Sequence, residues 1–388
     1  MTKDNQEKQR QEELLQEELS QEELRQEELR QEELRLAPLR IKIDEVDRQL
    51  IELLSRRAGL ALEVGHVKQD FGSAVFRPER ERQILEKIAQ INPGPLKNNG
   101  LQAIWLEIMS ACRAIEEQLT VAYLGPAGTF SEDATLQFFG HSIELMDCHS
   151  LDDVFRSVQA GRATYGVVPI ENSSEGAISR TLDLLLDTNL IISGEISIPI
   201  EHALLSVSTD LSQVKQVLAH AQALAQCQEW LNVHAPHLQR QAVSSNAQAA
   251  KLASVDPELA AIASLGAAKH YGLQVVHAAI QDDVHNRTRF VVIGQHACAP
   301  SGYDQTSLIL SVANEPGAVY QLLAPLAKYG VSMTRLESRP ARRGTWEYHF
   351  YIDIEGHQSE AHIASALQEL RSMAAFYKCV GSYPKSKI

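Results

Sequence analysis

The sequence has few of the features that stabilise secreted or membrane-bound proteins. Its 388 residues include only five cysteines, which lie far apart and form neither a CxxC pair nor a Cys/His pattern typical of zinc. No apolar run approaches the roughly 20 residues that a membrane helix needs, and the N-terminus lacks the apolar segment of a secretory signal. We therefore expect a cytoplasmic protein that binds no membrane and holds no structural metal.

Positive charge is also in short supply. The chain has 36 Lys and Arg against 50 Asp and Glu, a formal net charge of -14. A field of that sign repels polyanions, which argues against a nucleic-acid partner. Any anionic ligand is then expected to be held by a local cluster of Arg and Lys. The length predicts two to three folding units.

The N-terminal region is of low complexity. Residues 11–35 are five copies of the pentapeptide QEEL followed by Leu, Ser or Arg. A period of five advances about 500° round a helix, so the leucines form no stripe and no coiled-coil seam. We expect residues 1–35 to be a solvated charged helix or a disordered tail without chemistry.

The next segment predicts three helices. Apolar residues from Ile43 to Val64 recur at spacings of three, four and seven, which predicts one long helix to about Gln69. Pro78 suits the first turn of a second helix, and a third covers about 101–118. Such a segment encloses little core by itself, so we expect dimerisation through the long helix.

From Val121 the pattern predicts α/β structure. The strands VAYLG, YGVVPIE, QVLAH, AAIAS and RFVVIG alternate with helices, which directs helix N-termini to one edge of a sheet. Small and polar loops precede those helices and can bind carboxylates, although Ser and Asn there also serve as plain helix caps. After residues 299–302, a βαββαβ order predicts a ferredoxin-like unit.

These segments together resemble a known family. LRIKIDEVDRQLIELLSRRAGLALEVGHVK, VFRPERERQILE and LEIMSACRAIEEQL resemble the helices of bifunctional chorismate mutase/prephenate dehydratases, and AYLGPAGTFS, VVPIENSSEGAI, HAQALAQC and NRTRF resemble their dehydratase part. NEPGAV and ESRP resemble their ACT domain. The resemblance implies an all-α dimeric mutase domain (36–119), a two-lobed α/β dehydratase domain like periplasmic binding proteins (120–296) and an α+β ACT domain (303–385).

For the mutase, spacing and resemblance bear on different points. Arg57 and Lys68 lie three helical turns apart and both continue the apolar stripe, although basic residues on such helices are often only surface charge. By resemblance they hold a carboxylate and the ether oxygen of chorismate. Glu116 then faces the ether oxygen and must be protonated to donate a hydrogen bond. The remaining mutase residues implied are Arg40, Arg77, Arg80, Glu81 and Cys112.

For the dehydratase, the resemblance makes Thr288 the catalytic hydroxyl and Arg289 the partner of a substrate carboxylate. Thr288 is a weak acid, so we expect it to orient the leaving hydroxyl or to relay a proton from an acid such as Glu171. The other catalytic residues implied are Phe290, Asn172 and Gln226. The substrate-binding residues implied are Gly128, Thr129, Ser131, Ser173, His220 and Ser245.

The last unit is expected to sense the end product. By resemblance, its effector is L-phenylalanine, bound between paired subunits of a homodimer or higher homo-oligomer. Deletion beyond about Ser301 is then expected to give an enzyme insensitive to phenylalanine. The effector residues implied are Asn314, Gly317, Ala318, Val319, Glu337, Ser338, Arg339 and Pro340.

The sequence thus predicts an enzyme of phenylalanine biosynthesis that converts chorismate to prephenate and then to phenylpyruvate without a cofactor. Two alternatives remain open. One is a dehydratase for prephenate or arogenate with an inactive mutase segment. The other is a non-catalytic amino-acid sensor or transcriptional regulator, since two-lobed α/β domains also bind effectors. Against the regulator, no basic face or helix-turn-helix is present.

Overall fold

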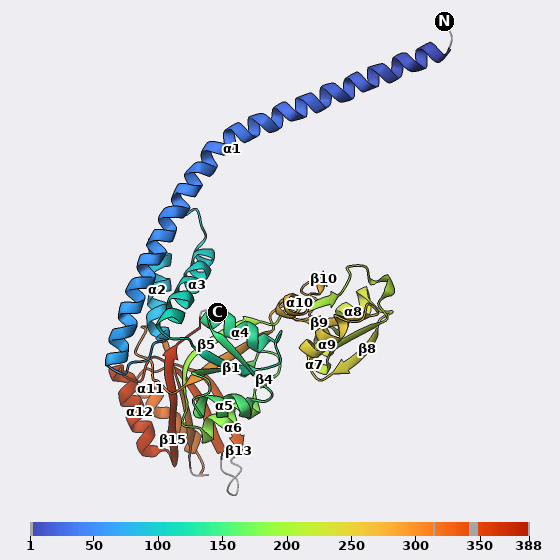
Figure 1. Cartoon of the computed structure of the whole chain (residues 1–388). Coiled ribbons are helices and arrows are strands. Elements are labelled where there is room, and N and C mark those ends of the chain that lie inside the picture. The colour runs from blue at the N-terminus through green and yellow to red at the C-terminus, as the bar shows by residue number, and fades with distance from the viewer. Residues whose placement is uncertain (1–2, 313–314, 341–347, 387–388) are drawn as a thin grey trace. The chain divides into compact units, whose positions relative to one another are not determined.

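A computed structural model describes residues 3–312, 315–340 and 348–386 of the chain (Figure 1). The chain divides into two compact units, Met1–Val64 and Gly65–Ile388, and each is described by itself. Over these residues, no helix is both long and apolar enough to cross a membrane. The same residues include no group of three or more His, Cys, Asp or Glu that could hold a metal ion.

The first unit is helical and consists of α1 (Lys3–Asp70) up to Val64. This helix includes the pentapeptide copies, and Pro38 lies within it. The predicted apolar residues are helical, but much of their surface is exposed: Ile43 is 58%, Leu50 50% and Val64 50% exposed. Because a large apolar face in water marks a site of association, dimerisation through α1 stays our expectation.

Two further helices open the second unit. α2 (Pro78–Ile91) begins at its proline, as predicted, and α3 (Asn98–Glu116) follows. Phe76, just before α2, is only 3% exposed and packs its ring against Phe139 and Tyr165 of the next domain. The sequence did not predict this aromatic anchor, which ties the start of α2 to the core of the first lobe.

The first lobe contains a mixed sheet in the order β2-β1-β3-β11-β5, with the short β4 beside β3. Strand β11 is antiparallel to both β3 and β5 and arrives last along the chain, after the whole second lobe. The elements are β1 (Thr120–Leu124), α4 (Phe130–Phe139), β2 (Glu144–Cys148), α5 (Leu151–Gln159), β3 (Tyr165–Asn172), β4 (Gly176–Ala177), α6 (Ser179–Asp187), β5 (Ile191–Pro199) and β11 (Arg287–Gly294).

The second lobe contains a five-stranded sheet in the order β10-β6-β9-β7-β8, with its own alanine-rich core. The predicted two-lobed α/β architecture is therefore confirmed. The elements are β6 (Ala203–Ser206), η1 (Leu211–Gln213), β7 (Gln216–His220), α7 (Ala221–Gln226), α8 (Gln228–His234), β8 (Gln239–Val243), α9 (Asn246–Ala253), β9 (Leu259–Ala263), α10 (Leu265–Tyr271) and β10 (Gln274–His277).

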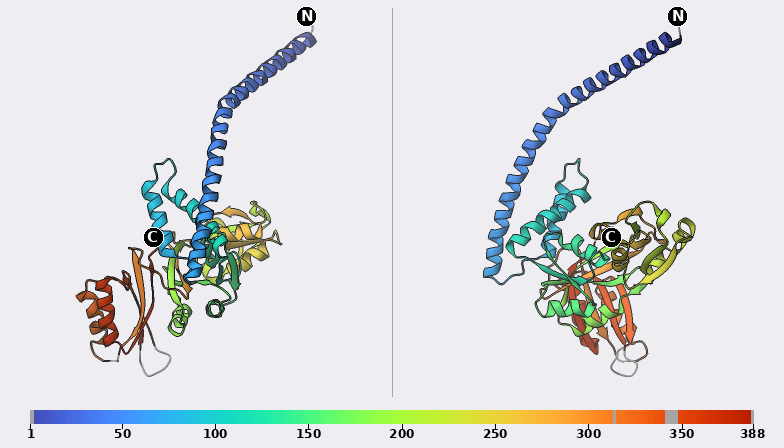
Figure 2. Two further views of the ribbon diagram at one scale, coloured as in Figure 1. Left: turned by 60° about the vertical axis from the view of Figure 1, so that its left-hand side comes forward. Right: turned by 45° about the vertical axis from the view of Figure 1, so that its right-hand side comes forward.

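The C-terminal domain has the predicted βαββαβ order, and its sheet runs β13-β14-β12-β15. Figure 2 shows both helices on one face of this sheet. Leu308 and Ile352 pack against these helices, whereas Ile309 and Tyr351 on the opposite face join the core of the first lobe. The elements are β12 (Asp304–Ser311), α11 (Ala318–Lys328), β13 (Met333–Pro340), β14 (Tyr348–Glu355), α12 (Ala361–Met373) and β15 (Phe376–Pro384).

Candidate active site

An irregularity between β3 and β11 decides which side chains face the space between the lobes. Thr288 pairs with Asn172 and Arg289 with Glu171, but Phe290 pairs with Pro169, so Ile170 has no opposite partner. The extra residue in such a bulge reverses, beyond that point, the alternation of side chains between the two faces of the sheet. As a result Asn172 and Thr288 share one face of the sheet, and Glu171 and Arg289 share the other.

The face that carries Asn172 and Thr288 borders a cavity of about 300 Å³. The first residues of three helices, α4, α7 and α9, also line it. Free backbone N–H groups and the helix dipole make such N-termini favourable for anions. The predicted dehydratase residues that line this cavity are Gly128, Thr129, Ser131, Asn172, His220, Gln226, Ser245 and Thr288.

The hydroxyl of Thr288 is a hydrogen-bond acceptor for Asn172. Asn172 donates from Nδ2 to Oγ1 of Thr288 at 2.8 Å, and its own Oδ1 accepts from the backbone N–H groups of Ser174 and Glu175 at 3.0 and 3.2 Å. Because two backbone donors hold the amide oxygen, the NH₂ group must face Thr288. The hydroxyl therefore accepts from Asn172 and keeps its hydrogen for a partner in the cavity.

The cavity is not the cationic pocket that the sequence predicted. Among the described residues, no Lys or Arg lines it. The hydroxyls of Thr129 and Ser131, the imidazole of His220 and the helix N-termini provide the polar surface instead. An anionic substrate is thus met by dipoles and N–H or O–H donors, which bind carboxylates without a formal positive charge.

His202 is a cavity residue that the sequence did not predict. Its Nε2 lies 2.8 Å from Oε1 of Gln226, and its Nδ1 has no hydrogen-bond partner. Burial lowers the pKa of His202 from its usual range, while the hydrogen bond with Gln226 opposes this, so the ring is neutral at pH 7. Nothing in the apolar sequence around His202 marked it as a site residue.

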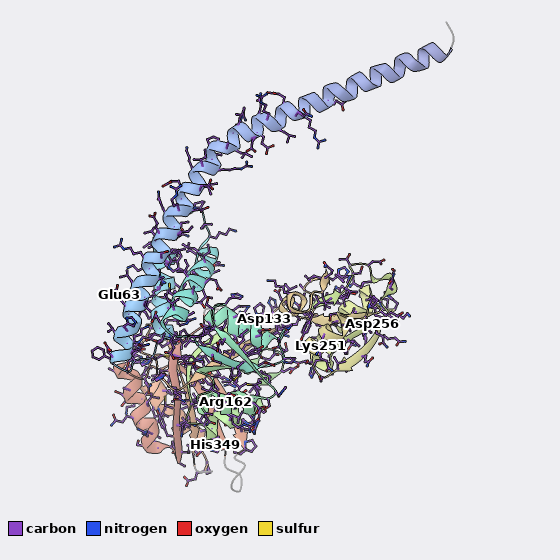
Figure 3. The ribbon with its side chains drawn as sticks, viewed as in Figure 1. Glu63, Asp133, Arg162, Lys251, Asp256 and His349 are labelled. Carbon is purple, nitrogen blue, oxygen red and sulfur yellow. The ribbon has the colours of Figure 1, made fainter. Side chains whose placement is uncertain are left out.

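Contacts between α4 and α10 hold the two lobes together beside the cavity. Asp133, labelled on α4 in Figure 3, lies so close to Gly266 that a Cβ there would meet its Oδ1 at 2.3 Å. Gly128, in the loop before α4 and with φ of +82°, also lies near α10, since a Cβ there would meet the Cα of Ala267 at 3.1 Å. Tyr271 also donates to the carbonyl of Ala127 at 3.2 Å. These contacts fix one wall of the cavity.

Four predicted dehydratase residues do not line the cavity. Glu171 and Arg289 face the C-terminal domain, where Arg289 pairs with Asp353 at 2.6 Å. Phe290 is 2% exposed within the core of the first lobe. Ser173 accepts from the backbone N–H of Arg287 at 2.9 Å, which secures the turn. The placement of Glu171 and Arg289 in the cleft is thus corrected, because the bulge and strand alternation direct them away.

The predicted mutase residues fall in both units. Lys68 donates from Nζ to Oε2 of Glu116 at 3.0 Å and to the carbonyl of Val75 at 2.9 Å. Arg113, which the sequence did not predict as a site residue, is 4% exposed and pairs with Glu81. Of the others in the second unit, Arg77 and Arg80 are exposed and Cys112 is buried, whereas Arg40 and Arg57 belong to the first unit.

The predicted effector residues lie at the edge strand β13 and at the start of α11. Gly317 adopts φ of +83° at the N-cap of α11, a conformation that favours glycine, and Ala318 and Val319 follow it. Asn314 lies outside the described residues. On β13, Glu337 and Arg339 are partly buried, while Ser338 and Pro340 are exposed. Arg339 pairs with Asp183 of α6 at 3.2 Å.

Comparisons with known proteins agree with this arrangement. Residues 39–117 match chorismate mutase type II, residues 121–298 match prephenate dehydratase and residues 306–372 match the ACT domain. A bifunctional chorismate mutase/prephenate dehydratase of Neisseria gonorrhoeae is 46% identical over 348 residues, which make up 89% of this chain and 96% of that protein. The chain belongs to this bifunctional family.

Two further proteins support the assignment. A Pseudomonas aeruginosa protein with the same bifunctional name is 44% identical over 353 residues, which cover 89% of this chain and 97% of the relative. The solved prephenate dehydratase of Arthrobacter aurescens, in complex with L-Phe, is 32% identical with a TM-score of 0.63. The structural match covers 69% of this chain and 90% of the Arthrobacter aurescens chain.

Family membership confirms the predicted function. The chain is a bifunctional enzyme that rearranges chorismate to prephenate and dehydrates prephenate, as its mutase and dehydratase domains indicate. Its relatives carry both activities in their names over nearly the same length, which counts against an inactive mutase segment and against a sensor without catalysis. The predicted multidomain fold, with helical, two-lobed and ACT parts, is confirmed as well.

Proposed function

We propose that the cavity between the lobes binds prephenate and that Thr288 is its catalytic hydroxyl. The observation that carries this is the hydrogen bond from Asn172, which leaves the O–H of Thr288 to donate into the cavity. Prephenate loses its ring carboxylate as CO₂, and the electrons of that C–C bond displace the ring hydroxyl. Thr288 donates a hydrogen bond to this leaving oxygen, which departs as hydroxide and becomes water by taking a proton from the solvent.

A proton relay from Glu171 has no support in the geometry, because Glu171 faces the C-terminal domain. Among the described residues, Glu175 is the Asp or Glu side chain that lines the cavity, and the imidazole of His202, whose pKa burial lowers, lies there too. We assign the substrate's carboxylates to the N-termini of α4 and α9, where Ser131 and Ser245 lie. In this arrangement the gain of aromaticity drives the reaction, and the enzyme orients the leaving group.

For the mutase we propose that Lys68 and Glu116 face the ether oxygen of chorismate and that Arg80 and Glu81 bind its hydroxyl end. The contact between Lys68 and Glu116 supports this, since it places both groups together on α1 and α3. Arg113 is positioned to orient Glu81. Roles for Arg40, Arg57, Arg77 and Cys112 stay predictions from the sequence.

Replacing Glu116 by glutamine tests its protonation. If the carboxyl must donate to the ether oxygen, wild-type mutase turnover falls with rising pH, by up to about tenfold per unit once the carboxyl ionises in the complex. Glu116→Gln keeps a donor that does not titrate, so its profile becomes flat. Rates of chorismate loss, measured about every half pH unit between about pH 5 and 9, test this expectation.

The matched control is Glu117→Gln, because Glu117 is the neighbouring carboxylate and is exposed. It should retain the wild-type pH profile. An unchanged slope in Glu116→Gln would remove Glu116 from the donor role and leave Lys68 as the group at the ether oxygen.

We further propose that the ACT domain binds L-phenylalanine at Gly317–Val319 and residues 337–340, next to a second copy of the chain. The Arthrobacter aurescens dehydratase is in complex with L-Phe, which supports this effector. On the edge strand and α11, Leu336 is 42% and Tyr320 80% exposed, which suits an interface between copies. A homodimer or higher homo-oligomer and a cytoplasmic location are part of the proposal.

The overall proposal is tested by supplying chorismate to the purified chain and measuring phenylpyruvate as its enolate in alkali. We expect phenylpyruvate to form from chorismate and from prephenate, and added phenylalanine to lower the second rate. Turnover of chorismate with no phenylpyruvate would contradict the assignment of the two-lobed domain. No response to phenylalanine would contradict only the effector site.

A further inference from the structure

A cluster of five charged side chains lies between the first lobe and the sheet of the ACT domain. Arg289 of β11 is at its centre, with Nη2 2.6 Å from Asp353 of β14 and Nη1 3.6 Å from Glu195 of β5. Glu171 lies 3.9 Å from Nε of Arg289 and 3.3 Å from Arg335 of β13. Three strands of the first lobe's sheet, β3, β5 and β11, are thereby connected on the face away from the cavity to two strands of the ACT sheet.

Apart from Glu171, whose side chain is 38% exposed, this cluster is buried, and further hydrogen bonds reinforce it. The side chains of Asp353 and Glu195 are each 4% exposed, and that of Arg289 is 18% exposed. Ser307 donates to Asp353 at 2.6 Å and lies 2.7 Å from the hydroxyl of Tyr383. Burial raises the pKa of Glu195, although Arg289 opposes this. Buried, hydrogen-bonded ion pairs of this kind hold their partners in one geometry more strictly than surface pairs do.

Each charged residue on β3 and β11 is the chain neighbour of a cavity residue. Arg289 follows Thr288, and Glu171 precedes Asn172, with the members of each pair on opposite faces of the sheet. A rotation or slide of β11 that frees Arg289 therefore moves the hydroxyl of Thr288 and the 2.8 Å bond from Asn172. Misplacement by about 1 Å is enough to cost a reaction on the order of 100-fold.

We propose that Asp353 of the ACT domain is a positioning residue for dehydration, holding Arg289 so that β11 presents Thr288 to the cavity. This rests on the proposed role of Thr288. The ACT sheet is then a structural part of the dehydratase site. Because Arg335 lies on β13, the strand that also carries the proposed effector segment, any displacement of β13 reaches Glu171 and Asn172 through the same cluster.

The test compares Asp353→Asn with Asp183→Asn in the full chain. Asp183 pairs with Arg339 at 3.2 Å across the same boundary, but neither of them borders a cavity residue. We expect Asp353→Asn to lower kcat for prephenate by about tenfold or more, with KM changed less than about twofold. Asp183→Asn should stay within about twofold of the wild type in both constants. Mutase turnover, measured on the same samples, should be unchanged in both.

Two further variants separate positioning from general damage. Asp353→Glu keeps the charge and should recover most of kcat. In a Thr288→Ser background, whose hydroxyl is less constrained, Asp353→Asn should cost clearly less than in the wild type, because residues that act as a unit are not additive. Equal losses in Asp353→Asn and Asp183→Asn, or a loss of mutase turnover alongside, would overturn the proposal.

Should Asp353→Asn yield no folded protein, Ser307→Ala replaces it, since it removes only the hydroxyl that donates to Asp353. A smaller loss confined to kcat supports the proposal, and an unchanged kcat contradicts it. The proposed role of Thr288 is contradicted by a different result, namely that Thr288→Ala retains dehydration.

Discussion

Thr288→Ala is expected to abolish dehydration and leave mutase turnover intact. The substitution removes the hydroxyl that accepts from Asn172 and borders the cavity, and one positioned hydrogen-bond donor at a developing charge contributes about 10²- to 10³-fold. Thr288 is 8% exposed, so the loss of its hydroxyl alters little surface. Phenylpyruvate formation from prephenate and loss of chorismate, followed on one preparation, measure the two activities.

Thr288→Ser and Thr188→Ala are the controls. Serine keeps the hydroxyl and should retain much of the activity. Thr188 is a buried threonine of the same lobe whose Oγ1 accepts from Leu190 at 3.1 Å, and it does not line the cavity. If Thr188→Ala lost dehydration as fully as Thr288→Ala, the loss would reflect destabilisation of the lobe.

Truncation after Ser301 is expected to destroy the dehydratase, and not merely its response to phenylalanine. The sequence alone predicted a desensitised enzyme. In the structure, Ile309, Tyr351 and Val380 of the ACT sheet belong to the core of the first lobe. Their removal exposes an apolar face, at about 1.5–3 kcal/mol for each fully buried side chain, in a protein whose total stability is about 5–15 kcal/mol.

The truncation also removes Asp353, the closest partner of Arg289. Loss of one partner of a buried ion pair costs about 3–5 kcal/mol, which adds to the loss of packing. We expect thermal denaturation, followed by circular dichroism, to begin at a markedly lower temperature, together with loss of phenylpyruvate formation. A truncated chain with an unchanged melting curve and full dehydration would contradict the shared core, and substitutions at the effector segment are therefore the sharper test of phenylalanine binding.

Local sequence determined the helices, most strands and the domain order. Pro78 marks the first turn of α2 because it lacks an N–H that the first turn does not use. The βαββαβ order of the last domain follows from hydrophobic periodicity, which depends on neighbours within about ten residues. The helix N-termini around the cavity were predictable for the same reason, since small and polar loops end the strands that precede them.

Only the tertiary structure decided which way the site residues face. Alternation along β3 places Val167 and Pro169 on the cavity side and would place Glu171 there too, but the bulge opposite β11 puts Asn172 there instead. That bulge depends on pairing between segments more than a hundred residues apart. It therefore cannot be predicted from the sequence pattern of either strand alone. The same pairing sends Arg289 to Asp353.

The sequence therefore determined the enzyme family and the order of its mutase, dehydratase and ACT parts. It could not determine that, among the described residues, the cavity between the lobes is lined by helix N-termini, hydroxyls, two imidazoles and Glu175 but by no Lys or Arg. Nor could it determine that Phe76 and the ACT sheet complete the core of the first lobe. Composition and periodicity reflect the preference of each segment for helix, strand or turn. Packing between distant segments decides which way a side chain faces and which charged groups lie beside it.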